Sequence, residues 1–460
     1  MIVFEFFRMK QAMTSQPAQH SAAPAPAPAR MDTRRNVVAY TGDTIGFFTG
    51  MSFIPATTVL VGLASTLTSD KTLIGIIAMA WGVASLFPQL IAARLVQGKR
   101  RTKPTVILYS LIGRQTMLLF ALWLLFTNAQ SPLLTVFLMI AAIVVFCVFD
   151  SFTGIGWFDM LSRNLSPRGR GRILGRAQLL GSITGIGAGF VVARVLSPDG
   201  LPFPRNYAVV FICAWLGFII SLLFQFAYEE NPASEGDASA AAAAARSGSF
   251  IGSVLNGLRV DAIYRRVLLA RILTGLEAMA AAFYVVYIKD RLKLPDTSIG
   301  IFSLAFIIGG ILGVALFTWL ASRWGARSVV RAAAVLQAAA PLVAFLVALI
   351  PSLETVPVLA YALFAVILAF DGAAARAYVL GFCGYTIDCA PAHQRSIYVG
   401  VLNTLGGLVG LSPVLAGLWL DAAGTAGTAT AYPVMFGAVA ICAGVGAILS
   451  FTLPRVEQRA

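Results

Sequence analysis

The chain has 460 residues, of which 58% are hydrophobic and only 12% charged, and its formal net charge is +14. A typical soluble domain carries about 25% charged residues, so this chain has too little charge to cover a surface that faces water, and a soluble protein is excluded. The basic residues cluster in short segments between apolar runs, as in the cytoplasmic loops of membrane proteins. We therefore expect a lipid bilayer around the chain and no nucleic acid as a partner.

Residues 1–35 are predicted to be a disordered cytoplasmic tail. The opening MIVFEFFRMK has its basic residues after a short apolar stretch that Glu5 interrupts, which is the reverse of a signal peptide. The Ala/Pro repeat SAAPAPAPAR follows at 21–30. Such a segment is extended and cannot build a packed core.

Beyond the tail, apolar runs of membrane-spanning length follow one another to the end of the chain. A membrane helix needs about 20 mostly apolar residues. We predict twelve spans, at 37–64, 72–96, 104–127, 132–161, 172–196, 206–228, 265–288, 298–321, 328–350, 355–387, 396–420 and 430–453.

One connection, 229–262, is long and rich in Glu, Ser, Gly and Ala, and it separates six spans from six. The predicted fold class is an all-α integral membrane protein of two six-helix bundles. The bundles cover 36–228 and 263–454, the loop between them is cytoplasmic, and a short cytoplasmic tail covers 455–460.

The distribution of lysine and arginine predicts the orientation. With the N-terminus in the cytoplasm, 25 of the 34 basic residues lie in cytoplasmic segments, six lie outside and three lie within spans. Cytoplasmic loops of membrane proteins carry such an excess of positive charge. We therefore expect both termini in the cytoplasm, which requires an even number of spans.

The two halves carry matching signals in corresponding loops. PRGRGRILG (167–175) precedes the fifth span and PAHQRSIYVG (391–400) precedes the eleventh, and in each a glycine follows an arginine by five residues. The arginines, Arg170 and Arg395, are 225 positions apart. Arg94 and Arg323, in the loops after the second and eighth spans, are 229 apart. Two anchors with nearly the same offset indicate an internal duplication.

These features resemble the major facilitator superfamily over nearly all of residues 36–454. That family has two six-helix halves, a basic Asp-Arg-x-Gly-x-Arg loop in each half and a long cytoplasmic loop between them. SRWGAR at 322–327 matches the loop with serine in place of aspartate, and in the first copy Ala93 replaces the aspartate and the glycine comes late, at Gly98. The run at 167–175 looks like a loop of poorly characterised bacterial branches of the family. The resemblance implies a multi-pass transporter of the cell (inner or plasma) membrane.

The arginines at the cytoplasmic ends of spans are candidates for a gate. Arg94, Arg170, Arg323 and Arg395 could form ion pairs or cap helix carbonyls when the inner side closes. The alternative is that they only orient the chain by their charge.

Charged residues within spans are costly, about 2.5–3.5 kcal/mol each on insertion scales, and usually face a cavity. In the first half, Arg114 lies near the middle of the third span, with Asp43 and Asp150 as the available acids. Arg114 keeps its charge and so needs a carboxylate or an anionic ligand. A structural ion pair and an anion- or proton-responsive site both stay open; in the second case, reversing the charge of Arg114 abolishes transport.

In the second half, Glu277, Asp371 and Arg376 are the candidates. Glu277 is predicted to couple transport to protons, because a carboxylate removed from water binds a proton more readily; the alternative is a hydrogen-bonded or water-facing glutamate. Asp371 and Arg376 are five positions apart, which disfavours pairing along one helix, so we expect pairing across helices. Arg271 lies two turns from the cytoplasmic end of its span and is interpreted as extending to the interface.

Glycines repeat at every fourth position in two spans, which indicates close helix packing. They are Gly42, Gly46 and Gly50 in the first span and Gly181, Gly185 and Gly189 in the fifth.

The expected function is secondary active transport of a small solute by alternating access between the halves, coupled to H+, with one chain sufficient as a monomer. No ATP-binding loop of the GxxxxGK[ST] type is present. Two histidines and five unpaired cysteines give no metal site, no cofactor is expected, and no catalytic grouping indicates an enzyme. An efflux antiporter or a lipid or amphiphile flippase on the same fold is the alternative, and a non-transporting sensor is a third.

Overall fold

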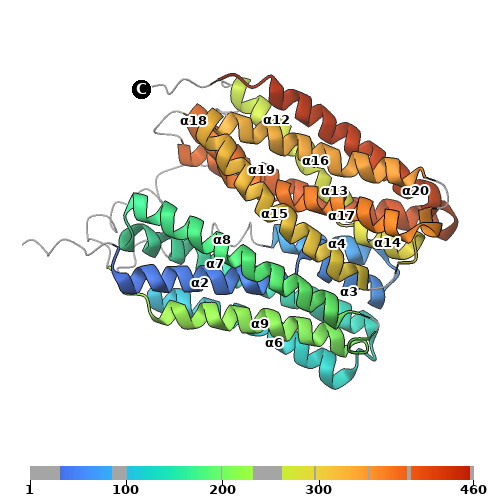
Figure 1. Ribbon diagram of the computed structural model, residues 1–460, viewed down its shortest axis with the longest axis horizontal. Helices are drawn as coiled ribbons and strands as arrows, with labels where there is room; N and C mark the ends of the chain where they lie inside the picture. Colours follow the sequence, from blue (N-terminus) through green and yellow to red (C-terminus); the bar gives the residue numbers. More distant parts are fainter. Residues whose placement is uncertain are drawn as a thin grey trace, which may run out of the picture.

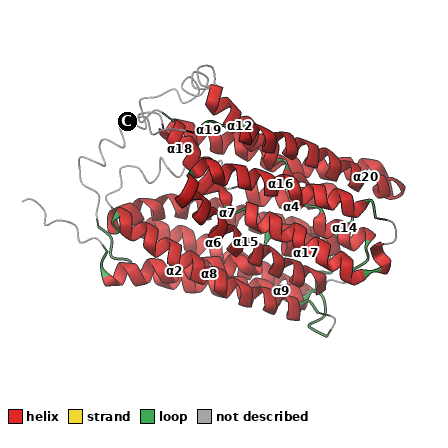
Figure 2. Ribbon diagram, turned by 45° about the horizontal axis from the view of Figure 1, so that its top comes forward, coloured by secondary structure: helices red, strands yellow, loops and turns green. Residues whose placement is uncertain are grey.

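The computed structural model describes residues 32–84, 101–197, 199–231, 262–294, 297–350, 353–390 and 395–455. Over these ranges every regular element is helical, as Figure 2 shows. The prediction of an all-α protein is confirmed for this part of the chain.

In the first half, the first span is interrupted after α2, and five further helices follow in the described residues. Its elements are α2 (Arg34–Phe53), η1 (Ala56–Leu60), α3 (Val61–Leu67), α4 (Lys71–Val83), α6 (Lys103–Thr127), α7 (Pro132–Asn164), α8 (Pro167–Val195) and α9 (Arg205–Phe226).

The second half repeats this order with more interruptions. Its elements are α12 (Ala262–Gly275), α13 (Glu277–Ala281), α14 (Tyr284–Arg291), α15 (Thr297–Trp324), α16 (Ala326–Ala348), η2 (Leu353–Thr355), α17 (Pro357–Ala374), η3 (Tyr378–Cys383), α18 (Gly384–Cys389), α19 (Arg395–Leu408), η5 (Val409–Leu411) and α20 (Ser412–Phe451). Within α20 the backbone departs from helical geometry at Gly424, with φ +62°, so this element holds the last part of one span and all of the next.

Eleven stretches of helix in the described residues are long and apolar enough to cross a membrane, and α4 is a shorter apolar helix. The second predicted span, 72–96, ends outside the described residues, so the count of twelve stays a prediction. Large apolar side chains such as Phe126, Val358 and Ile441 lie on the outside, 82%, 80% and 70% exposed. An exposed apolar surface of this kind fits lipid, and the prediction of a multi-pass membrane protein is confirmed.

The helices form two groups that lie side by side along the molecule (Figure 1). In the first group α2 packs against α8 and α9, and α6 packs against α7 and α9; in the second, α16 packs against α20 and α15 against α17. The largest contacts between the groups are those of α8 with α15 and of α4 with α20, and smaller ones join η1 to α15 and α3 to α14. The bounds of the bundles at 36–228 and 263–454 stay predictions, as does the cytoplasmic position of both termini.

The predicted glycine contacts are confirmed. A Cβ on Gly46 would stand 2.6 Å from the backbone nitrogen of Ser221 in α9, and one on Gly185 would stand 2.6 Å from the Ser52 hydroxyl in α2. Only a residue without a side chain permits this approach, because cores of this density leave no room for an added methyl group.

Three spans are irregular in the middle. In the first span, the helix is interrupted at Pro55, between α2 and η1. In the seventh span, the helix is interrupted twice, between α12 and α13 and between α13 and α14, and no proline stands at either place. The tenth span contains the π-helix η3. Irregular backbone at membrane depth occurs where it is buried in protein or lines a cavity, and π-helical turns are frequent at functional sites. These breaks therefore indicate where a site should be sought.

Candidate functional site

Two buried carboxyl groups of the second half lie near these breaks. Glu277 is the first residue of α13 and Asp371 lies in the last turn of α17, with 6% and 7% exposure. Their charges act on one another. Glu277 Oε1 and Asp371 Oδ2 are buried and have no hydrogen-bond partner among the described residues. The predicted pairing across helices thus brings two acids together, not an acid and a base.

Asp371 also faces the first half of the molecule. The hydroxyl of Thr57, in the π-helical turn η1, lies beside its carboxylate. Next to it, the hydroxyls of Thr58 and Ser303 lie 2.7 Å apart and join η1 to α15. The acid pair therefore lies at the junction between the halves.

Arg376 reaches the first half as well. Its guanidinium carbon lies 5.8 Å from the centre of the Phe48 ring in α2. No ion pair links it to Asp371 or to another described residue, so the prediction of an ionic partner across helices is wrong for the described part of the chain. Gly310 of α15 leaves room for it, because a Cβ there would stand 3.2 Å from Arg376 Nε.

Arg271, which sequence reasoning left out of the site, lines a cavity of about 310 Å³ at the boundary of the halves. Its guanidinium carbon lies 5.3 Å from the ring centre of Tyr378 and 5.5 Å from that of Phe382. Its Nε is buried without a partner among the described residues. The interpretation that this side chain extends to the membrane interface is therefore wrong.

Asp43 and Arg114 form a buried ion pair within the first half, 3.9 Å apart and each about 4% exposed. Arg114 donates to the carbonyl of Phe218 at 3.0 Å. Asp43 accepts from four further donors. They are Ser221 Oγ, Gln225 Nε2 (3.2 Å), Tyr228 Oη and Trp157 Nε1 (2.7 Å). A buried carboxylate whose hydrogen-bonding capacity is met by this many donors is held in one position, which favours the structural interpretation.

Asp150 lies half-buried in α7, near this pair. Its charge and that of Arg114 act on one another, and no ion pair joins them. The three first-half candidates therefore come together as one group, separate from the acid pair of the second half.

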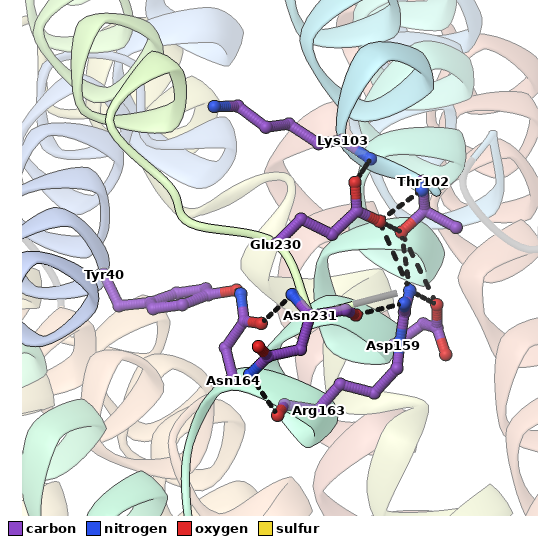
Figure 3. Close-up of polar contacts among 8 residues, drawn as sticks. All are labelled: Tyr40, Thr102, Lys103, Asp159, Arg163, Asn164, Glu230 and Asn231. Carbon is purple, nitrogen blue, oxygen red and sulfur yellow. Dashed lines mark hydrogen bonds and ion pairs between the residues drawn. The ribbon is translucent and has the colours of Figure 1, made fainter. Parts of the chain in front are cut away.

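A polar network covers the end of the first half where α2 begins and α9 ends (Figure 3). Arg163 of α7 contacts Asp159 at 2.5 Å and Glu230 at 3.5 Å, and it donates to the carbonyl of Asn231 at 2.6 Å. Glu230 accepts from the backbone nitrogens of Thr102 and Lys103. The first residues of the predicted inter-bundle loop are therefore fixed to the first half.

Of the four gate candidates, the structure describes the side chain of Arg323 alone. Arg94 lies outside the described residues, and Arg170 and Arg395 lie at the beginnings of α8 and α19 with side chains that the structure does not describe. Arg323 is exposed at the end of α15, where its guanidinium carbon lies 5.9 Å from the ring centre of Trp324. Their role stays a prediction.

At the opposite end of the molecule, polar contacts join the halves; we call this group of contacts the clasp. Lys71 Nζ of α4 lies 2.5 Å from Asp290 Oδ2 of α14, which also accepts from Tyr432 of α20 at 3.0 Å. Asp421 of α20 accepts from the backbone nitrogens of Lys71 and Thr72 at 2.9 and 2.8 Å. At the end where α2 begins, the ion pairs between described residues are those of Arg35 and Arg163 and stay within the first half. The halves are thus bound together at one end.

Known proteins resemble this chain in sequence over one half and in fold over nearly all of it. The sequence model of the Major Facilitator Superfamily matches residues 267–460, the second half. No curated protein sequence matches the chain. The fold of the whole chain is similar to that of transporters in solved structures, with which it shares only 12–14% sequence identity.

Three of these structures cover nearly the whole chain. A point mutant of the nucleoside transporter NupG has a TM-score of 0.62 at 14% identity, with 91% of this chain and 100% of that one covered. An auto-inhibited peptide transporter of the POT family has 0.61 at 12%, covering 92% and 98%. A bacterial homologue of the human lysosomal transporter Spinster, inward-facing and occupied, has 0.58 at 12%, covering 92% and 96%.

The resemblance to the major facilitator superfamily is confirmed in sequence over residues 267–460. The matched region contains Glu277, Asp371, Arg271 and Arg376, so the candidate site lies mainly in the half that carries the superfamily's sequence signature. At 12–14% identity the solved structures show the fold of this chain and not its function.

Sequence reasoning missed two features of the site. The count of spans placed Arg271 near a membrane interface. The cavity that this arginine lines depends on a helix break without a proline and on glycines from four different elements, and these come together only in the folded chain. The clasp was also missed, because Lys71 was counted only as a basic residue of the outer side. The acids that contact it, Asp290 and Asp421, lie in the other half of the chain, so no local signal joins them to it.

Proposed function

We propose that this chain is a secondary active transporter of the cell membrane that moves a small solute by alternating access and couples its movement to protons. One chain holds both halves and acts as a monomer, with both termini in the cytoplasm. The observation that carries the proposal is the buried pair of carboxyl groups, Glu277 and Asp371, at the junction of the halves.

Two carboxyl groups that repel each other out of water do not both keep their charge, and the pair titrates as a unit. A proton that enters the pair lowers the cost of burying it and permits the halves to close around it. The unpartnered oxygens of both side chains leave room for that proton. Because Asp371 also faces Thr57 in the first half, the protonation state affects the contact between the halves.

The distribution of contacts between the halves supports alternating access. The clasp binds them together at one end, and at the other end the ion pairs of described residues stay within one half. A pair of bundles held at one end corresponds to one of the two states of a rocking transporter. With both termini in the cytoplasm, this state faces inward, as does the structure of the Spinster homologue.

Proteoliposomes that contain the purified chain test the proposal. A panel of radiolabelled small solutes, with nucleosides and dipeptides among them, is assayed for accumulation under an imposed pH gradient of either direction. Glu277→Gln and Asp371→Asn should abolish gradient-driven accumulation and keep the exchange of labelled for unlabelled solute, because exchange needs no net proton movement.

Asp199→Asn is the matched control, since Asp199 is an exposed acid in a connecting segment and should leave accumulation unchanged. Accumulation that persists in both carboxyl variants would contradict proton coupling through this pair. If no solute of the panel moves in the unmodified protein, the assignment as a transporter is wrong. The preferred gradient direction distinguishes uptake from efflux.

A further inference from the structure

The cavity beside Arg271 is built around a cation without an anion. It lies between α4 of the first half and α12, η3, α19 and η5 of the second. Five of its ten lining residues are glycines: Gly82, Gly275, Gly406, Gly407 and Gly410. Its volume of about 310 Å³ is at the small end of the range for ligand sites, about 300–1,000 Å³.

Arg271 is held in this cavity by contacts that leave its hydrogen-bonding capacity unused. The rings of Tyr378 and Phe382 lie within 5.5 Å of its guanidinium carbon. A Cβ on Gly275 would stand 2.8 Å from Arg271 Nη1, and one on Gly406 would stand 3.4 Å from Nε. The glycines therefore give the guanidinium its space, and the aromatic rings orient it.

No carboxylate of the described residues neutralises this side chain. Glu277 is near enough for its charge to act on Arg271, but the two form neither a hydrogen bond nor an ion pair. An arginine keeps its charge in proteins, and a buried charge without a partner is costly. A second arginine, Arg376, stands on the same half with no ionic partner among the described residues.

The charges around the cavity favour an anion. Arg271 lines it, and its ten lining residues include no aspartate or glutamate. A negatively charged ligand in the cavity compensates the charge of the guanidinium.

We propose that Arg271 binds the acidic group of a small anionic solute, a carboxylate or a phosphate, in the cavity between α4, α12 and α19. This inference rests on the proposed function, because it names the chemical class of the substrate of that transporter. The planar guanidinium offers two parallel donors to either group.

The test is a binding experiment that needs neither a gradient nor turnover. The unfolding temperature of the purified full chain is measured in detergent at equal ionic strength. The anions are lactate and succinate, which are carboxylates, and inorganic phosphate. Lactamide and glycerol serve as uncharged counterparts. A ligand that binds the folded state raises its unfolding temperature. We expect one class of anion to do so with saturation and the uncharged compounds to have no effect.

Two variants locate the binding. Arg271→Gln should weaken the anion effect tenfold or more, as expected for loss of a charge-assisted hydrogen bond. Gly82→Val fills the cavity and keeps the arginine, and a Cβ at Gly82 would meet no atom within 4 Å, so this variant should fold and also bind more weakly. The matched controls are Arg205→Gln, at an exposed arginine at the start of α9, and Gly187→Val, at an exposed glycine whose Cβ would likewise meet open space.

The inference is overturned if no anion of the panel stabilises the unmodified chain, or if both Arg271→Gln and Gly82→Val bind as well as the controls. Its failure is distinct from failure of the proposed function. Proton-driven accumulation of an uncharged solute would support the proposed transporter and contradict an anionic substrate. Anion binding without accumulation in proteoliposomes would support the anion site and contradict the proposed transporter.

Discussion

At the scale of single residues, the two groups of buried charges differ in how fully they are satisfied. Asp43 has four hydrogen-bond donors and lies 3.9 Å from Arg114, whereas Glu277 and Asp371 each keep an unpartnered oxygen. A satisfied pair stabilises the fold, and an unsatisfied one can respond to a proton or a ligand.

Asp43→Asn is therefore expected to destabilise the protein. Loss of one member of a buried ion pair costs about 3–5 kcal/mol, which corresponds to a fall of roughly 5 °C or more in the unfolding temperature. Differential scanning fluorimetry of the purified chain measures this. Asp150→Asn is the control, because Asp150 is half-buried and forms no ion pair with a described residue, and equal losses in the two variants would argue against the structural interpretation.

Sequence reasoning at this scale succeeded where chemistry alone decides. A charge in a span needs a partner or a cavity, so Asp43, Arg114, Glu277 and Asp371 could be singled out from residue type and position. Which of them are satisfied could not be predicted, since that depends on donors more than 100 positions away, such as Trp157 and Ser221.

At the scale of the helix, close packing depends on glycines that the sequence displays. α2 lies so near α9 that a Cβ on Gly46 would stand 2.6 Å from Ser221 N and 2.9 Å from the carbonyl oxygen of Gly217. Both atoms belong to the backbone, so no side-chain rotation can relieve the contact.

Gly46→Leu should therefore force α2 and α9 apart, with a loss of at least about 1–3 kcal/mol of stability, the usual cost of overpacking. The yield of monodisperse protein in size-exclusion chromatography and the unfolding temperature measure the effect. Gly187→Leu, on the exposed side of α8 with open space around its Cβ, should be tolerated. A Gly46→Leu protein as stable as this control would mean that the helices are not in close contact.

The extent of the helices was predictable and their interruptions were not. Apolar runs gave the spans to within a few residues, for example 104–127 against Lys103–Thr127 for α6. The breaks between α12, α13 and α14 have no proline to mark them, and they place Glu277 at a helix start. Local sequence cannot indicate such breaks, because they depend on packing against distant parts of the chain, chiefly α16 and α20 for α13, and α3 and η1 for α14.

At the scale of the whole molecule, the clasp holds one of two arrangements of the halves. Lys71 is 9% exposed and contacts Asp290 across the boundary. If the halves rock, weakening the clasp must lengthen distances at that end and shorten them at the other, because the same rigid bundles move in both places.

Lys71→Met should accordingly shift the population away from the clasped arrangement. Pairs of spin labels at Ser69 and Arg291, and at Arg34 and Arg265, report on the two ends by double electron–electron resonance in a variant whose five native cysteines are replaced. We expect the distance distribution at the clasp end to gain a longer component and the distribution at the other end to gain a shorter one. The populations of the two arrangements should change several-fold, because about 1.4 kcal/mol changes a two-state equilibrium tenfold. Lys293→Met, at an exposed lysine of the same end, should leave both distributions unchanged. Lengthening at the clasp without shortening at the other end would mean that the contacts there are local, and that the two bundles do not exchange access by moving against each other.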